Sequence, residues 1–428
     1  MDPMLLAIIL FAVTYVLMIA FGKYRPYIAL ASGVVFVVAM LLDGLSVPDL
    51  IGVLDFNMLL MIAGTMGLVQ LFIDSQMPNR LADIVMNHVP NVCWAVVALS
   101  LFAGIISAFV DNVATVLMVA PVALAICNKL KTNPVPVIIA IAVSSNLQGA
   151  ATLVGDTTAI MLGSALDMSF LDFFWYQGKP SIFFAVELGA VLSAAILYIL
   201  FRKEKSAIPK GAPRTEVTDY VPSALLVGTI ALLIAASFIP NKPGITNGLI
   251  CVVLMGIGLA YNYTKKKTVS AVLGPLKEID FQTIGLLVGL FLMIGGISHM
   301  GVIDAAANLL ARMGGGNIFL LYTVIVWASV LISAFIDNIP YVATMLPVIQ
   351  GLAATLGINP TLLYFGLLSG ATLGGNCTPI GASANITGIG ILRKDGHEVK
   401  NSDFFRIGIP FTLAAIVPAY LYFWFIFA

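Results

Sequence analysis

The sequence predicts an all-α polytopic membrane protein built from two inverted-topology repeats. Of its 428 residues, 60% are hydrophobic and only 10% are charged, and the mean hydropathy is +1.03. Soluble domains carry about a quarter charged residues, so this composition excludes an ordinary soluble protein. A motif that occurs twice within apolar segments and a one-sided distribution of basic residues predict the inverted repeat.

The duplicated motif is 20 residues long and recurs without a gap at an offset of 226 residues. It reads IISAFVDNVATVLMVAPVAL over 105–124 and LISAFIDNIPYVATMLPVIQ over 331–350. Each copy places an Asp-Asn pair inside an apolar run, and a carboxylate at bilayer depth is costly and is by default a functional site. The same offset relates three further identical pairs: Gly149 and Gly375, Thr152 and Thr378, Gly155 and Gly381.

Ten apolar segments approach the ~20 residues that span a bilayer, at roughly 4–21, 27–43, 57–73, 136–166, 180–201, 222–239, 247–263, 281–298, 360–391 and 407–427. The segments 136–166 and 360–391 are too long for one plain span. Gly, Asn and Thr interrupt both, which predicts two half-helices joined by unwound backbone. Two further runs, 92–128 and 316–356, contain the Asp-Asn pairs and can form two helical arms that meet at a polar tip.

These segments divide the chain into two halves and a linker. The N-terminal repeat covers 1–201 and contains the hairpin 92–128 and the broken helix 136–166. The C-terminal repeat covers 222–428 and contains the hairpin 316–356 and the broken helix 360–391. The polar stretch 202–221 has no periodicity and is predicted to be a cytoplasmic linker. Five crossings per half is an odd number, so the second half enters the membrane upside down.

The basic residues support this topology. Eighteen of the 21 Lys and Arg residues fall on one predicted side, and only Lys179, Lys242 and Arg312 fall on the other. By the positive-inside rule this predicts a multi-pass protein of the cell (inner) membrane with both termini outside the cytoplasm. Acidic and basic residues balance at 21 each, so no nucleic-acid partner is expected.

Inverted repeats with paired broken helices indicate a secondary transporter with a site near the bilayer midplane. We expect both tips and both broken helices to contribute to it: Asp111, Asn112, Thr115, Asp337 and Asn338 from the tips, and Asn146, Gln148, Thr152, Asp156, Thr157, Thr158, Asn376, Thr378, Ser383 and Asn385 from the broken helices. Hard oxygen ligands suit a Na⁺ ion, which is expected near Asp111, Asn112, Asp337 and Asn338. A buried carboxylate can instead carry a proton. The coupling ion is therefore H⁺ or Na⁺, and no cofactor is expected. The alternative interpretation is that Asp and Asn merely cap the helical arms.

Four segments carry a family resemblance. SAFVDNVATVLMVAPV, NLQGAATLVGDTTAIML, SAFIDNIPYVATMLPVI and LGGNCTPIGASANITGI resemble the signature segments of the ion transporter superfamily. They are most similar to its arsenite-pump (ArsB), NhaD-type and P-permease (P-protein-like, CitMHS-type) branch. The resemblance implies two re-entrant hairpins whose tips meet two broken helices, a scaffold domain, a homodimer in the bilayer, and alternating access of an elevator type.

The sequence motifs do not select a single substrate. The dicarboxylate branch carries Ser-Asn-Thr at both tips, whereas this chain has Asp111 and Asp337 in place of Ser. Two carboxylates repel an anion unless they are protonated or paired with cations, which counts against citrate or succinate. Gly155-Asp156-Thr157-Thr158 resembles the Gly-Asp-x-Thr-Thr of sodium–proton antiporters, whereas the segment from Gly381 to Asn385 is P-permease-like.

We therefore expect a cation-coupled transporter of a small inorganic ion or hydroxide such as arsenite or antimonite. Sodium–proton exchange is the alternative, and a di- or tricarboxylate symporter is less favoured. An enzyme is not expected, because a membrane aspartyl hydrolase would need Tyr-Asp and Gly-x-Gly-Asp motifs that both tips lack. A cytoplasmic ATPase subunit as partner is left open.

Overall fold

The computed structural model describes residues 2–208 and 215–428, and most of this part of the chain is helical. Residues 209–214 of the predicted linker, with Lys210 and Arg214, lie outside the described residues. The first half contains α1 (Pro3–Ala20), α2 (Arg25–Leu42), α3 (Val47–Gly52), α4 (Phe56–Asp74), α5 (Met77–His88), α6 (Val92–Ser107), α7 (Asn112–Leu130), α8 (Val135–Gly149), α9 (Thr157–Ala165), the short strands β1 (Trp175–Tyr176) and β2 (Lys179–Pro180), and α10 (Ile182–Phe201).

The second half repeats this order ten helices later. It contains α11 (Val221–Ser237), α12 (Thr246–Lys266), α13 (Ser270–Lys277), α14 (Phe281–His299), α15 (Val302–Gly314), α16 (Ile318–Ser333), α17 (Asn338–Leu356), α18 (Thr361–Gly374), α19 (Ser383–Lys394) and α20 (Asn401–Phe427). The four short helices α3, α5, α13 and α15 were not expected from the sequence. Polar residues interrupt α5 and α15 too often for either to resemble a membrane span, although both present one apolar face.

Nine helices in the described ranges are long and apolar enough to cross a membrane, and the pair α15 and α16, bent by 119°, brings the number to ten. The total agrees with the ten predicted segments, but the members differ. The hairpin arms α7 and α17 have 19 residues each and pass this test alone, whereas the arms of both broken helices are too short. Both breaks occur where they were predicted, between α8 and α9 and between α18 and α19.

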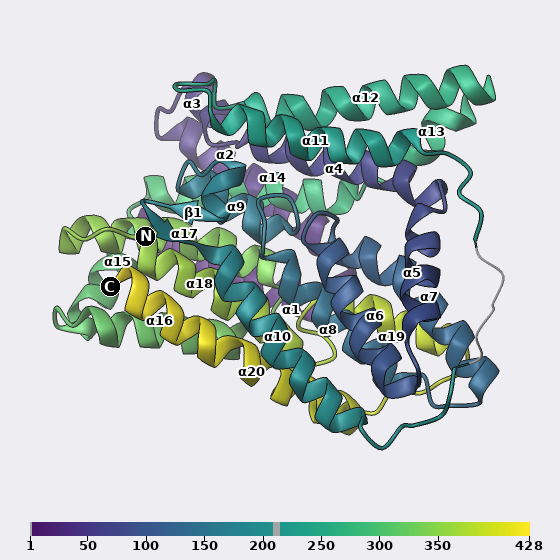
Figure 1. Ribbon diagram of the computed structural model, residues 1–428. Coiled ribbons are helices and arrows are strands. Elements are labelled where there is room, and N and C mark those ends of the chain that lie inside the picture. Colours follow the sequence, from purple (N-terminus) through teal and green to yellow (C-terminus); the bar gives the residue numbers. More distant parts are fainter. Residues whose placement is uncertain (1, 209–214) are drawn as a thin grey trace.

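The two hairpins open toward opposite ends of the molecule. The first turn of α6 lies on the linker, where the Val92 N–H donates to the Ser206 carbonyl at 3.1 Å. By contrast, α16 begins against the last turns of α20, with the rings of Phe319 and Trp424 4.7 Å apart. Figure 1 shows that α1 begins and α20 ends at one end of the molecule, and that α10 runs to the other. This arrangement is what an inverted repeat requires.

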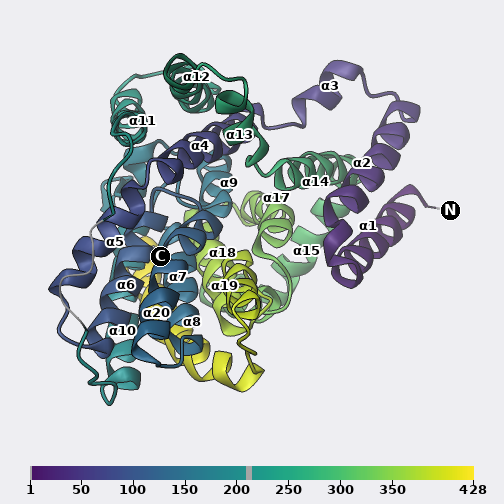
Figure 2. The same cartoon turned by 90° about the vertical axis from the view of Figure 1, so that its right-hand side faces the viewer.

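Two outer groups of helices pack against a larger helix bundle, here called the central bundle, and each outer group combines both halves (Figure 2). The central bundle consists of α6 to α10 and α16 to α20. In one outer group α2 packs along α14, and in the other α12 packs along α4. Small residues permit this close packing: a Cβ at Gly64 would lie 2.5 Å from the backbone of Cys251, and one at Gly289 would meet the backbone of Ala29.

Candidate functional site

Each half joins a hairpin tip to a helix break through the same hydrogen bond. The first tip is residues 108–111 and the second tip is residues 334–337. The Thr152 hydroxyl, in the first break, donates to the Ala108 carbonyl. The equivalent hydroxyl of Thr378, in the second break, donates to the Ala334 carbonyl. Backbone carbonyls that no helix satisfies are thus paired inside the protein, as bilayer depth demands.

A glycine in each break lets the two backbones touch. A Cβ on Gly155 would lie 2.7 and 2.8 Å from the carbonyl oxygens of Ser107 and Ala108. A Cβ on Gly381 would lie 2.8 Å from both equivalent oxygens of the second tip. No side chain fits at these distances. The glycines that recur at the 226-residue offset therefore bring each break against its own tip.

The tip aspartates do cap helices, as the alternative interpretation proposed. Asp111 Oδ2 accepts from the N–H groups of Val113 at 2.9 Å and Ala114 at 3.2 Å. Asp337 Oδ1 accepts from the Ile339 N–H at 3.2 Å. A carboxylate has about four lone-pair sites, so a cap uses only part of its capacity. Capping and ion binding are therefore compatible at both positions.

A chain of buried amides crosses the centre of the bundle. Asn112 Nδ2 donates to Asn146 Oδ1 at 3.0 Å, and Asn146 Nδ2 donates to the Thr372 carbonyl at 2.8 Å and to Asn376 Oδ1 at 3.0 Å. Asn376 Nδ2 in turn donates to the Val143 carbonyl at 2.9 Å. Positions 146 and 372 differ by 226, so equivalent residues meet where the two repeats face each other. Hydrogen bonding offsets the cost of burying these amides.

A cavity of about 170 Å³ lies between the first tip and the first turn of α17. Six of the predicted site residues line it: Asp111, Asn112, Asp156, Thr157, Asn338 and Ser383. The connection between α13 and α14 adds Glu278 and Asp280, so four acidic residues line the cavity. Among the described residues that line it, none is Lys, Arg or His. A cleft lined by one sign of charge concentrates counter-ions, so this cavity favours cations.

The remaining predicted residues brace the site from outside the cavity. Thr115 Oγ1 donates to the Val110 carbonyl at 3.4 Å, and Asn385 Nδ2 donates to two carbonyls of the second break at 3.0 Å. Thr158 Oγ1 donates to Asp156 Oδ2 at 2.8 Å and fixes that carboxylate beside the cavity. Gln148 is fully buried, and neither of its amide atoms has a hydrogen-bond partner in the part of the chain described.

Sequence reasoning missed three charged groups at the site. Arg25 lies 3.3 Å from Asp337 Oδ2, although its place in a basic loop indicated only topology. Asp280 caps α14 and also faces the cavity, together with Glu278. The available signal for Asp280 was its recurrence, because Asp55-Phe56 returns as Asp280-Phe281. No comparable signal identifies Glu278.

The prediction of a Na⁺ ion stays a prediction. Within the described ranges, no three His, Cys, Asp or Glu side chains converge as metal ligands. The four cysteines are free and separate; three are buried and Cys377 is partly exposed. Any cation in the cavity would therefore be bound by carboxylate, amide, hydroxyl and backbone oxygens, which suit a weakly held alkali ion or a proton.

The sequence profile of the family described as citrate transporter (CitMHS) matches residues 15–363 and 249–428. This chain belongs to the citrate transporter family. An uncharacterized transporter of Mycobacterium tuberculosis is 33% identical over 77% of this chain and 76% of its own length. The human P protein is 25% identical over 90% of this chain, which spans about 55% of that longer protein. The resemblance to the P-protein-like, CitMHS-type branch is confirmed, and so is the class of secondary transporter.

Two solved structures share the fold of this member of the citrate transporter family. The YdaH transporter of Alcanivorax borkumensis superposes with a TM-score of 0.63 at 12% identity, over 99% of this chain and 98% of that one. MtrF of Neisseria gonorrhoeae is described among antimetabolite efflux pumps. It superposes with a TM-score of 0.57 at 14% identity, over 86% of this chain and 80% of that one. The all-α polytopic membrane fold is thereby confirmed.

Proposed function

We propose that this member of the citrate transporter family is a cation-coupled secondary transporter of a small inorganic ion or neutral hydroxide, such as arsenite or antimonite. The acid-lined cavity beside the first tip carries the proposal. At an effective dielectric constant of 20, two like charges 4 Å apart repel by about 4 kcal/mol. An anion such as citrate would meet that repulsion from several carboxylates, whereas a cation or neutral hydroxide would not.

The coupling ion, H⁺ or Na⁺, belongs on Asp111 or Asp156. Arg25 already compensates Asp337, but no basic side chain in the described residues pairs with either of these two carboxylates. An unpaired buried carboxylate gains most from a bound cation. Binding a cation there would neutralise one of the four carboxylates of the cavity and favour movement of the central bundle relative to the outer groups.

Sodium–proton exchange without further cargo is the second candidate. The hydrogen bond of 2.8 Å from Thr158 to Asp156 favours it, because it fixes one carboxylate at the start of α9 beside the cavity. The description of the family as citrate transporters favours a third candidate, a di- or tricarboxylate symporter. That reaction would need several cations to neutralise the cavity first.

One flux assay separates these reactions. Purified protein is reconstituted in liposomes with an internal pH dye and an imposed proton gradient. Na⁺, Li⁺ and K⁺ are added first, followed by arsenite, antimonite, citrate and succinate. We expect coupled flux with arsenite or antimonite. Gradient collapse on Na⁺ or Li⁺ alone would replace this proposal with exchange, and flux with citrate alone would replace it with a carboxylate symporter.

The orientation is proposed with both termini outside the cytoplasm. In a cysteine-free background, a cysteine at position 204 should react with a membrane-impermeant thiol reagent only from the cytoplasmic side. A cysteine at position 242, at the opposite end of the molecule, should react only from outside. Reversed labelling would contradict this orientation.

A further inference from the structure

One ion pair ties an outer group to the central bundle. Arg25, the first residue of α2, reaches Asp337 of the second tip at 3.3 Å, and their side chains are 24% and 12% exposed. The Arg25 Nε–H also donates to the Met18 carbonyl at 3.2 Å. Of the four ion pairs among the described residues, the other three each join groups within one outer group or one loop. Arg25 is therefore placed to resist movement of the second tip.

A second basic residue occupies the equivalent place in the inverted half. The loop before α2 reads FGKYRP over 21–26, and the loop before α12 reads FIPNKP over 238–243, so Lys242-Pro243 corresponds to Arg25-Pro26. Helix packing also relates Arg25 to the start of α12. Gly289 packs on Ala29 and Gly64 on Cys251; counting back four residues from these contacts pairs Arg25 with Asn247.

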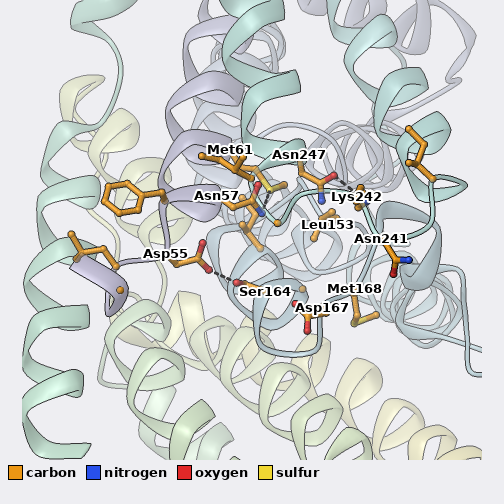
Figure 3. A pocket seen from close by; sticks show the side chains of 18 of the residues that line it. Asp55, Asn57, Met61, Leu153, Ser164, Asp167, Met168, Asn241, Lys242 and Asn247 are labelled. Carbon is orange, nitrogen blue, oxygen red and sulfur yellow. Dashed lines mark hydrogen bonds between the residues drawn. The ribbon is translucent and has the colours of Figure 1, made fainter. Parts of the chain in front are cut away.

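The side chain of Lys242 reaches that paired position. Its Nζ donates to Asn247 Oδ1 at 3.4 Å, as Figure 3 shows. The loop sequence thus pairs Arg25 with Lys242, and the helix packing pairs Arg25 with Asn247, the residue that the Lys242 head group contacts.

The two basic residues differ in what they contact. Arg25 engages the second tip, but Lys242 does not reach Asp111 of the first tip. Lys242 instead lines a cavity of about 890 Å³ together with Asp55, Ser164 and Asp167 (Figure 3). Partial burial lowers the pKa of Lys242, although Asp172 acts in the opposite direction. This ammonium has an open cavity beside it and no carboxylate at contact distance among the described residues.

We infer that Arg25 and Lys242 are alternating counter-ions of the two tips: Arg25 holds Asp337 in the conformation described, and Lys242 holds Asp111 in the opposite one. The two halves attach their tips by the same contacts, so exchanging their arrangements gives a second conformation of the same kind. In that conformation the first tip would lie against the start of α12. The inference rests on the alternating access proposed above.

Cross-linking tests the exchange directly. In full-length protein without its native cysteines, reconstituted in liposomes, the pair Arg25→Cys and Asp337→Cys should be bridged by a short dithiol-specific reagent. The pair Lys242→Cys and Asp111→Cys should also be bridged, because the opposite conformation brings these positions together. The control pair Lys179→Cys and Asp111→Cys should not be bridged. Lys179 lies at the same end but donates to the Ile426 carbonyl at 2.6 Å.

Adding Arg25→Gln should raise the yield of the Lys242–Asp111 bridge, because the competing conformation loses its ion pair. A purely structural role of Arg25 would not change that yield. If the wild type transports and the Lys242–Asp111 bridge never forms, the inference is wrong while the proposed function stands. If the wild type moves none of the ions tested, the proposed function fails first.

Variants with both tips intact give an independent measurement. Lys242→Gln should lower the transport rate by roughly tenfold, the scale of a typical coupling between two sites. Lys179→Gln should transport as the wild type does, and Arg25→Lys should transport better than Arg25→Gln. Wild-type rates in Lys242→Gln would overturn the inference.

Discussion

The two hairpin tips have the same backbone contacts but different side-chain partners. Thr152 and Thr378 attach them to their breaks by the same hydrogen bond, and equivalent glycines allow the approach. Asp111, however, faces an acidic cavity, whereas Asp337 is paired with Arg25. Residues that recur at the 226-residue offset thus build the scaffold of the site. Residues whose partners do not recur make its two halves chemically different.

The two breaks differ in the same way. Asp156 of the first break corresponds by the offset to Ala382 of the second, so only the first break carries a carboxylate. Thr157 corresponds to Ser383, and both line the cavity. Both breaks therefore present a hydroxyl group to the cavity, but only the first break presents a carboxylate. Cation binding should therefore depend on the first break more than on the second.

The largest expected difference between the halves comes from removing that charge. Asp156→Asn should lower the transport rate by about 100-fold, because an interaction with a charged group contributes up to ~3 kcal/mol. Ser383→Ala removes only a neutral hydroxyl and should lower the rate less than about tenfold. Initial rates in liposomes compare the two. Equal losses would show that the halves contribute equally.

A smaller effect is expected where the halves match. Gly155→Ala and Gly381→Ala each force a Cβ onto carbonyl oxygens of a tip, which should destabilise the protein by about 1–3 kcal/mol. Gly256→Ala is the control, because a Cβ there meets nothing within 4 Å. Thermal denaturation in detergent measures all three. A stable Gly381→Ala beside an unstable Gly155→Ala would contradict the structural equivalence of the two breaks.

The smallest effect concerns the hydrogen bonds from break to tip. Thr152→Val and Thr378→Val should each destabilise the protein by about 1–2 kcal/mol, since each leaves a buried carbonyl unpaired. Thr355→Val is the control, because its hydroxyl donates at 2.9 Å on an exposed helix surface. The same denaturation measurement applies. If the stability losses of Thr152→Val and Thr378→Val differ by more than the change in the control, the two hydrogen bonds are not equivalent.

The sequence predicted the features that repetition and hydropathy control. Both breaks, both tips and the division into two halves follow from the 226-residue offset and the apolar runs. Helices α5 and α15 were not predicted, because they lie between predicted spans and mix polar with apolar residues. The paired outer groups, α2 with α14 and α4 with α12, could not be predicted, because nothing in either partner's sequence specifies the other.

Only the part of the site that lies on the repeated segments could be predicted. Six predicted residues line the cavity, since they lie on segments that the repeat itself brings together. Arg25, Glu278 and Asp280 come from the outer groups, whose packing against the bundle is a tertiary property. The homodimer and the coupling ion stay predictions, and a cytoplasmic ATPase partner stays an open question.

The central claim, that ion coupling depends on the tip carboxylates, is tested most directly by Asp111→Asn in the liposome flux assay. Asn caps a helix about as well as Asp, so the variant should fold while losing only the charge. Asp219→Asn is the control, because Asp219 pairs with Lys265 at 2.7 Å and neither residue lines the cavity. We predict that Asp111→Asn abolishes coupled flux and that Asp219→Asn retains it. Wild-type flux in Asp111→Asn would contradict the account.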